Sequence, residues 1–492
     1  MLTSTAYEDS LLSFWPRVRD FAVPPTMIET ATARRHRGDW AGACTAAGID
    51  IDLDLRSLAR THGRDLAAEV RADLRHLTPD LLRWHMPRVA PDGLLRPGLT
   101  ITLARYDRAG RDGVHPVHLV VRTPPAWADG GQRISLALWD GSHGPDGDGR
   151  GSALDAHARR HPHPRPSRRF RLDLHRHLWD ARRTGELRVR SGADRPPGDA
   201  RSENPDLPVP VPQGLGCAVD RWAAEALIVL RAEGRTTDTD TDTDTGADTG
   251  ADTGIVTVRI GSRQRLLLDL VADPAGAEPP TPRIARAPDG GDLSALPVLP
   301  DAATWVLPDL ALIRAGAIEA GRLHPLVASA LVPEHTPAVS TGSADPAGQS
   351  RLVECRGARH RIGLVDGVLA PLDHDPAEIR REELLVALTG TPLPCLRAID
   401  EAHRQPHCLS GVRERLHHGD TTGALAVVEG LLGPDAVLRS GALQDELRAA
   451  ALRRLTYGLF RAGLAGPAQG RVLPGPDRPR SHRSRPRHTT GR

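Results

Sequence analysis

Residues 101–103 (ITL), 117–121 (VHLVV) and 134–138 (ISLAL) place an apolar side chain at every second position. Segments containing Gly, Asp and Pro separate the three runs. A period of two is typical of a strand with one buried face, and turn residues between such runs favour antiparallel pairing. The three runs therefore predict an antiparallel meander. Further strand-like runs at 226–231 (ALIVLR) and 255–270 extend this β region.

Helical patterns precede the β region. Leu66, Val70 and Leu74 recur every four residues, which is the spacing of one helix face. A pair of prolines at 24–25 suits the first turn of a helix, and Thr78 is a good N-cap for a short helix that reaches residue 84.

Helical patterns also follow the β region, at residues 307–331 and 376–464, with a predicted hairpin between them at 351–372 that turns at Asp366-Gly367. The expected fold class is α+β, with helical N- and C-terminal segments, a central antiparallel β region and long disordered loops. The domains expected are a helical domain (1–95), a β-rich domain with disordered loops at 140–169, 191–212 and 236–254 (96–275), a Pro-rich linker plus helix (276–350), a β-hairpin and helical domain (351–466) and a disordered basic tail (467–492).

All 64 basic residues other than histidine are arginine, so the chain contains no lysine. This absence excludes P-loop, pyridoxal phosphate, kinase and Ser-x-x-Lys chemistry, because each needs an ε-amine. The five cysteines are scattered and include no C-x-x-C pair, which argues against a disulfide framework and a zinc ribbon. Without a signal peptide or a long apolar run, we expect a cytoplasmic protein with reduced thiols and no membrane contact.

One motif occurs twice. Residues 34–43 (RRHRGDWAGA) return at 415–424 (RLHHGDTTGA). The Gly-Asp pair predicts a helix–turn–helix joint in which glycine ends one helix and aspartate caps the next. Gly42 and Gly423 are expected to let paired helices approach closely. The motif resembles the inter-helix turn of tetratricopeptide repeats, although a tandem array of 34-residue repeats is missing.

A second resemblance involves residues 354–375 and 394–433. These stretches are similar to uncharacterised proteins of GC-rich actinobacterial type, some of which are associated with operons for MoxR-type AAA ATPases and von Willebrand A-domain proteins. The resemblance implies an accessory role in a multi-protein assembly and assigns no role to any residue.

Histidines and cysteines suggest several metal sites, each of which competes with a purely structural interpretation. His175-Arg176-His177 has H-x-H spacing, but it lies among eleven arginines between 159 and 190, which favours a solvated basic face. Cys355 with His360 and His374 is a looser alternative. The metal candidates nearest one another in sequence are Cys395, His403, His407 and Cys408, although adjacent ligands suit a tetrahedral site poorly.

The leading hypothesis is a non-enzymatic scaffold or adaptor that binds other proteins and needs no cofactor. The resemblance implies a AAA ATPase and von Willebrand A-domain system as its partners. Trp40 and Trp84 are the adaptor's candidate anchors, with buried packing as the alternative role for each. A metal- or thiol-dependent enzyme using the Cys/His cluster near 395–408 is a second hypothesis. A nucleic-acid-associated factor acting through residues 159–190 or the Arg-rich tail is a third.

Overall fold

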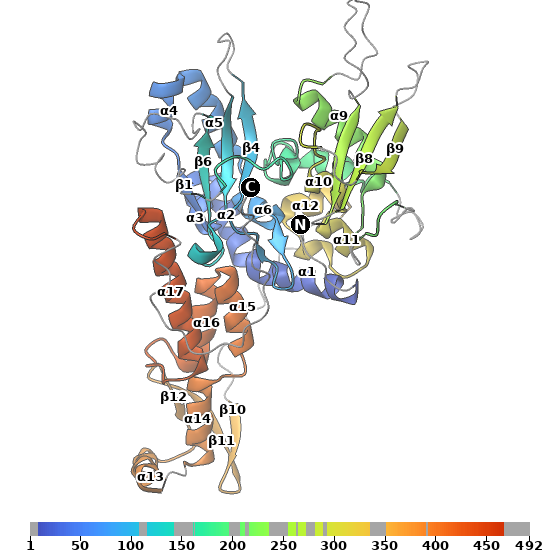
Figure 1. Cartoon of the computed structure of the whole chain (residues 1–492). Coiled ribbons are helices and arrows are strands. Elements are labelled where there is room, and N and C mark those ends of the chain that lie inside the picture. The colour runs from blue at the N-terminus through green and yellow to red at the C-terminus, as the bar shows by residue number, and fades with distance from the viewer. Residues whose placement is uncertain are drawn as a thin grey trace, which may run out of the picture.

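The computed structural model describes residues 8–107, 116–141, 161, 163–195, 207–211, 216–235, 254–261, 264–271, 281–288, 293–334, 351–389 and 392–466. Two parts are visible in Figure 1. Residues up to 334 form a body that contains two larger sheets and one two-stranded sheet, and residues 351–466 form an elongated arm below it. The α+β class expected from the sequence is confirmed. The tail and the Thr/Asp repeat lie outside the described residues, as do most of the other loops expected to be disordered.

The first sheet contains the predicted meander. Strands β4 (Thr100–Tyr106), β5 (Val117–Arg122) and β6 (Ile134–Trp139) pair antiparallel. The order is β1-β6-β5-β4, because β1 (Ile49–Asp52) joins the edge parallel to β6. The sequence predicts a helical segment over residues 1–95, so the strand β1 within it is not expected. A strand of four residues is too short for its period to stand out among helices.

Helices cover this sheet. They are α1 (Glu8–Ala22), α2 (Pro25–His36), α3 (Trp40–Ala46), α4 (Leu55–His62), α5 (Arg64–His76) and α6 (Pro79–His85), followed by the small pair β2 (Arg88–Val89) and β3 (Leu94–Leu95). Later segments join the same core: η2 (Arg176–Leu178), α8 (Leu187–Ser191), α11 (Pro308–Arg314) and α12 (Pro325–Leu331). The body also contains three short turns, η1 (Ala126–Ala128), η3 (Thr184–Glu186) and η4 (Ala320–Arg322), and η1 packs in a separate cluster with α17 (Ala442–Ala462). One hydrophobic core therefore runs from Trp15 to Leu331 and crosses the boundaries expected at 95 and 275.

The second sheet consists of β7 (Ile255–Ile260), β8 (Gln264–Val271) and β9 (Thr281–Arg286), and it packs against α9 (Val219–Ala232) and α10 (Asp301–Thr304). The strand predicted at 226–231 is wrong, because these residues belong to α9. Trp222, Ala226 and Val229 are buried at helical spacing, so the apolar run is the inner face of a helix. A short apolar run does not distinguish a strand from a buried helix.

The arm begins with a three-stranded sheet: β10 (Arg351–Cys355), β11 (Ala358–Val365) and β12 (Val368–Pro371). Five helices follow: α13 (Pro376–Thr389), α14 (Pro394–Arg404), α15 (Leu409–His418), α16 (Thr421–Leu432) and α17 (Ala442–Ala462). The turn predicted at Asp366-Gly367 is confirmed, with both residues at positive φ. A second left-handed turn at Arg356-Gly357 adds a strand that the sequence did not indicate.

The repeated motif forms the same turn in both places. Gly38 and Gly419 have φ of 78° and 87°, and the aspartate after each accepts a hydrogen bond from the next helix, Gly42 N to Asp39 and Gly423 N to Asp420, both at 2.8 Å. A Cβ at Gly423 would lie 2.2 Å from the Asp420 carboxylate. The second glycine of each motif therefore leaves room for the capping side chain, and Gly42 also leaves room for Arg34 of the preceding helix, 2.4 Å from an added Cβ.

Arg83 joins the arm to the body. Its guanidinium is buried and donates to three backbone carbonyls: Ala22 O at 2.9 Å, Gln132 O at 2.5 Å and His418 O at 2.7 Å. Beside it, a Cβ on Gly419 would lie 2.0 Å from Gly131 O. The backbone at the end of α15 therefore packs directly against the backbone of the loop that precedes β6.

The last helix of the arm returns to the body. Tyr457 donates to Asp50 at 2.5 Å, and Arg461 forms an ion pair with Asp52, so both contacts reach β1. Phe460 packs edge-on against Trp127 with ring centroids 5.3 Å apart. The arm is therefore fixed to the body at two separate points, the turn between α15 and α16 and the C-terminal part of α17.

Gly419→Ala tests the joint between arm and body. At Gly38, where nothing lies within 4 Å of an added Cβ, alanine is expected to cost about 1 kcal/mol of left-handed strain. Gly419→Ala carries the same strain and also forces Gly131 to move. We therefore expect its loss in the free energy of unfolding to exceed that of Gly38→Ala by at least about 2 kcal/mol. Urea unfolding of both variants measures the difference, and equal losses would contradict the close approach.

Buried histidines predict that acid destabilises the native state. Burial lowers the pKa of His85 and of His418 to about 3, and for His418 the neighbouring Arg88 and Arg83 add to the shift. Unfolded histidines bind protons below about pH 6.5, so the unfolded state holds more protons between that pH and about pH 3. The free energy of unfolding should fall as the pH drops through this window, by up to about 1.4 kcal/mol per pH unit for each histidine. Denaturant titrations at several pH values give the free energy of unfolding as a function of pH. Its dependence on pH should be weaker for His418→Asn than for the wild type, and an unchanged dependence would refute this cause.

Candidate functional site

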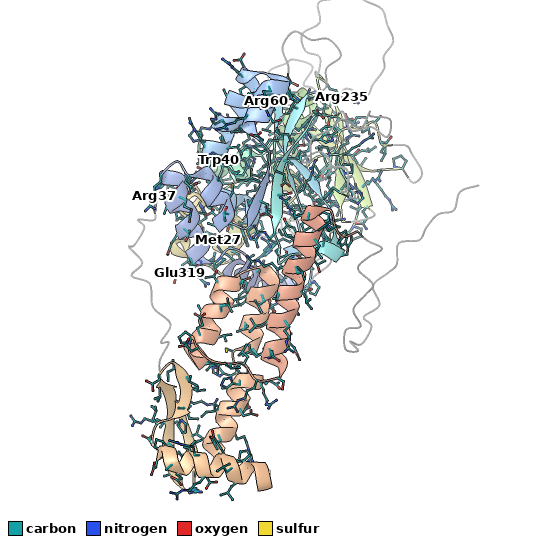
Figure 2. The ribbon with its side chains drawn as sticks, turned by 90° about the vertical axis from the view of Figure 1, so that its left-hand side faces the viewer. Met27, Arg37, Trp40, Arg60, Arg235 and Glu319 are labelled. Atoms are coloured by element: carbon teal, nitrogen blue, oxygen red, sulfur yellow. The ribbon has the colours of Figure 1, made fainter. Side chains whose placement is uncertain are left out.

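The two tryptophans proposed as anchors occupy different environments. Trp84 is 3% exposed and packs edge-on against Trp15 at 5.5 Å. Its indole N–H donates to Asp309 at 2.7 Å, and the Arg19 guanidinium lies 4.8 Å from its ring. Trp84 is therefore a core residue and offers no docking surface. Trp40 is half-buried on the body (Figure 2) and packs against the same core.

The H-x-H pair does not lie on a solvated basic face. His175 and His177 are buried, and His175 faces Glu225 at 3.2 Å. Burial lowers the pKa of His177 well below its usual value, with the neighbouring His175 adding to the shift. Both imidazoles belong to the packed interior.

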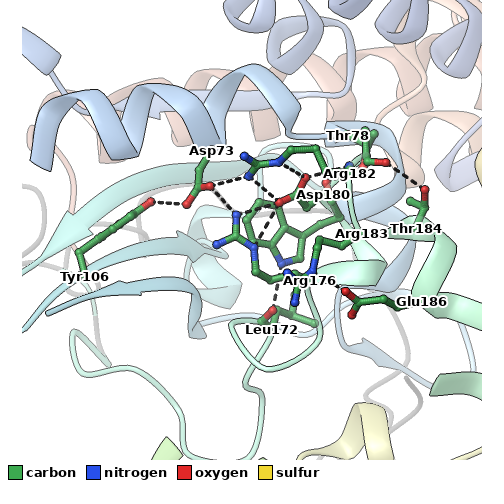
Figure 3. A network of polar contacts seen from close by, with 12 residues as sticks. Asp73, Thr78, Tyr106, Leu172, Arg176, Asp180, Arg182, Arg183, Thr184 and Glu186 are labelled. Atoms are coloured by element: carbon green, nitrogen blue, oxygen red, sulfur yellow. Dashed lines mark hydrogen bonds and ion pairs between the residues drawn. The ribbon is translucent and has the colours of Figure 1, made fainter. Parts of the chain in front are cut away.

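The arginines around this pair are also largely matched by acids. Arg176 and Arg182 both contact Asp73 and Asp180, while Tyr106 donates to Asp73 at 2.8 Å (Figure 3). Further ion pairs of the segment 159–190 involve Arg168, Arg169, Arg171, Arg183 and Arg190. These pairs remove most of the free positive charge that a nucleic-acid surface would need.

The four metal candidates near residues 395–408 are not brought together. Cys395 and His403 lie on α14 eight residues apart, which places them about 12 Å apart along the helix axis. Cys408 packs in a different core from Cys395. Among the residues that the structure describes, one group of three or more His, Cys, Asp and Glu side chains has metal-binding proximity, and it combines Cys395 with Cys355 and His374.

Three segments of the arm supply this Cys/His cluster. Cys355 ends β10, His374 follows β12, and Cys395 lies in the first turn of α14. One donor atom from each side chain lies within 4.8 Å of the other two. His360 stacks on His374 with ring centroids 4.2 Å apart and an interplanar angle of 16°.

Hairpin geometry explains why His360 joins the cluster. Arg356 and Gly357 at φ of 54° and 79° form the tight turn between β10 and β11. Cys355 pairs with Ala358, and Val353 pairs with His360. Because side chains two apart in a strand share a face, Cys355 and His360 point to the same side of the hairpin.

The electrostatics of the cluster follow from its burial. Both cysteines are fully buried, and burial together with the adjacent Cys355 thiol raises the pKa of Cys395 to about 11. The side chain of His374 is 3% exposed, and its Nδ1 lies 3.6 Å from Glu378. Two thiols and two imidazoles are the donors of a transition-metal site, and two nearby thiols are also capable of forming a disulfide.

A cleft of about 360 Å³ lies at the joint and includes residues 419–422 of the second Gly-Asp turn. Three arginines line it: Arg83, Arg133 and Arg454. Arg83 donates to backbone carbonyls, and the charge of Arg133 is matched by Asp50.

Exposed apolar side chains are concentrated on the arm. Among the described residues, all but two of the large exposed hydrophobics lie there, the exceptions being Val189 and Val271. On α17, Leu452, Leu455 and Leu459 are 48%, 59% and 37% exposed and share one helix face. The others on the arm are Leu352, Leu364, Val365, Val368, Leu372, Leu384, Leu385, Leu425, Val437 and Leu464.

Comparison with known proteins gave no match, since no family model fits the chain and no curated protein or solved structure resembles it significantly. Within the described part of the chain, none of the helices combines the length and apolarity that crossing a bilayer requires.

Trp84→Phe tests the assignment of Trp84 to the core. The substitution removes a donor from the buried Asp309 carboxylate, so we expect a loss of about 1–3 kcal/mol in the free energy of unfolding. Trp40→Phe, at a half-buried position, should cost less than about 1 kcal/mol. Denaturant unfolding of both variants measures the contrast, and a Trp84→Phe protein as stable as the wild type would refute the assignment.

Proposed function

We propose that this chain is a non-enzymatic scaffold or adaptor that binds another protein through its arm, as part of a bacterial multi-protein assembly. The concentration of exposed apolar side chains on the arm carries the proposal. A folded domain rarely leaves contiguous apolar surface open to water, and such surface commonly marks an interface.

The stripe on α17 is the sharpest part of this surface. Leu452, Leu455 and Leu459 lie on one face, while Tyr457 and Phe460 on another face pack against the body. The helix is thus held in place by the body and keeps its leucines exposed. A preformed helix face binds with a smaller loss of conformational entropy than a segment that must first fold.

The proposed partners are proteins, with a MoxR-type AAA ATPase and a von Willebrand A-domain protein as specific candidates from the resemblance described above. The proposal includes a cytoplasmic location, which the five free cysteines support. The enzyme hypothesis loses support because the cluster near 395–408 is not assembled. The nucleic-acid hypothesis now depends on the tail, which lies outside the described residues.

Changing the α17 stripe should abolish partner binding without unfolding the chain. We expect the variant L452E/L455E/L459E to bind at least about 100-fold more weakly, because central apolar anchors each contribute about 1–2 kcal/mol or more. Val189→Glu, at a residue 63% exposed on the body, is the matched control and should bind normally. The measurement is affinity purification of the full chain from its host with quantitative mass spectrometry, followed by titration with the purified AAA ATPase and von Willebrand A-domain proteins.

Two outcomes would overturn the proposal. One is recovery of the chain without any stoichiometric partner. The other is equal binding by the triple variant and the wild type. Sedimentation of the purified chain adds a further distinction, since a stable dimer disrupted by the triple variant would assign this face to a second copy of the chain.

A further inference from the structure

We propose that Cys355, His360, His374 and Cys395 form a structural zinc site that fastens the β10–β12 sheet to α14. This inference goes beyond the adaptor function and does not depend on it. It starts from the convergence of three separate segments on one buried point of the arm.

The spacing of the donor atoms suits a single ion. The donors of Cys355, His374 and Cys395 lie within 4.8 Å of one another, whereas two donors on one tetrahedral zinc are roughly 3.5–4 Å apart. A small inward movement of these three side chains is therefore enough for them to share one ion. To become the fourth ligand, His360 must tilt away from its stacked arrangement on His374.

Unsatisfied nitrogen atoms point to the same conclusion. His374 Nε2 and His360 Nδ1 are buried and have no hydrogen-bond partner in the described structure. Buried polar atoms are normally satisfied. Other buried histidines, such as His85 and His418, also have an unpartnered nitrogen, so what points to a cation here is the pair of such nitrogens in stacked rings beside two thiols. A bound cation would satisfy both nitrogens.

The second nitrogen of His374 faces an acid. Nδ1 lies 3.6 Å from Glu378 Oε2, on the first turn of α13. Metal-bound histidines commonly direct their other nitrogen toward a carboxylate, which orients the ring and strengthens it as a ligand. Glu378 is therefore a positioning residue for His374.

The types of donor atom indicate which metal binds and whether the site is structural or catalytic. Two cysteines and two histidines form the Cys₂His₂ set typical of zinc, and both thiols are closed to solvent. A site with four protein ligands and no open position is structural. Zinc binding releases the thiol protons, and the ion becomes a cross-link between residues 355 and 395.

The arm also needs such a cross-link. The core between the sheet and α14 contains only six buried residues in the described structure: Cys355, Ile362, Leu393, Cys395, Ala398 and Ile399. A core of this size supplies little stability, and small modules commonly gain the rest from a metal or a disulfide.

Metal analysis of the full chain tests the inference. Protein purified under reducing conditions should contain about one zinc per chain, and Cys355→Ser, Cys395→Ser and His374→Gln should each lose it. Cys408→Ser is the matched control, because Cys408 packs in a different core, and it should retain the zinc. A chain lacking residues 467–492 should also retain it, which separates this site from ions held by the tail histidines.

Binding of Co²⁺ to the wild-type protein tests the site even if the variants fail to fold. Co²⁺ added to the wild-type apoprotein should give the visible spectrum of a tetrahedral thiolate site, and His360→Gln should keep the thiolate bands with a weaker affinity. Chelator should lower the unfolding temperature of the wild type and leave the metal-free variants unchanged.

Several results would overturn the inference. They are a reduced, folded chain without zinc that also fails to give the cobalt spectrum, a Cys355–Cys395 disulfide in the protein as isolated, or loss of zinc from Cys408→Ser alone. None of these readouts involves a partner protein. A zinc-loaded chain that binds no partner would count against the adaptor function only.

Discussion

The buried guanidinium of Arg83 joins three separate parts of the chain, because each of its three nitrogens donates to a backbone carbonyl of a different segment. It binds the last carbonyl of α1, the last carbonyl of α15 and the carbonyl of Gln132 beside the sheet. Helix C-termini carry partial negative charge, so these carbonyls offset part of the cost of burying the cation. Burial still lowers the pKa of Arg83 to about 10, which leaves it charged at neutral pH. Lysine has three donors and a less rigid geometry, and it could not make the same joint.

The use of arginine alone has consequences throughout the body. Planar guanidinium groups bridge two acids at once, as Arg176 and Arg182 do between Asp73 and Asp180 (Figure 3). A segment that is strongly basic in sequence therefore becomes a nearly neutral network in the fold. Counting charges along the chain overestimates its basic surface, since the compensating acid Asp73 is distant in sequence.

Local sequence patterns predict the elements that depend on neighbouring residues. They do not predict contacts between residues that are distant in the sequence. The meander, the Gly-Asp caps and the turn at Asp366-Gly367 depend on neighbouring residues, and all three were predicted. Pairing of β1 with β6 and burial of α9 depend on what packs against them, so their types were missed. The Cys/His cluster shows the same limit. Its two cysteines were assigned to different candidate groups, because the path from residue 355 to residue 395 passes through a hairpin and a helix before it closes.

Two features at the far end of the arm differ in kind: a buried cluster of metal-binding side chains and a set of exposed leucines. Inside it, one donor atom from each of Cys355, His374 and Cys395 lies within 4.8 Å of the other two, a spacing that suits a single ion. Outside it, Leu384 on α13 is 70% exposed, so much of its apolar side chain stays in contact with water. None of the described side chains of α13 is buried, so that helix gains little from the core beneath it. Helices that bury no face are marginal in water, since packing supplies most of their stability. The buried Cys/His cluster therefore bears on how the arm folds, and the exposed leucines bear on the proposed binding of a partner protein.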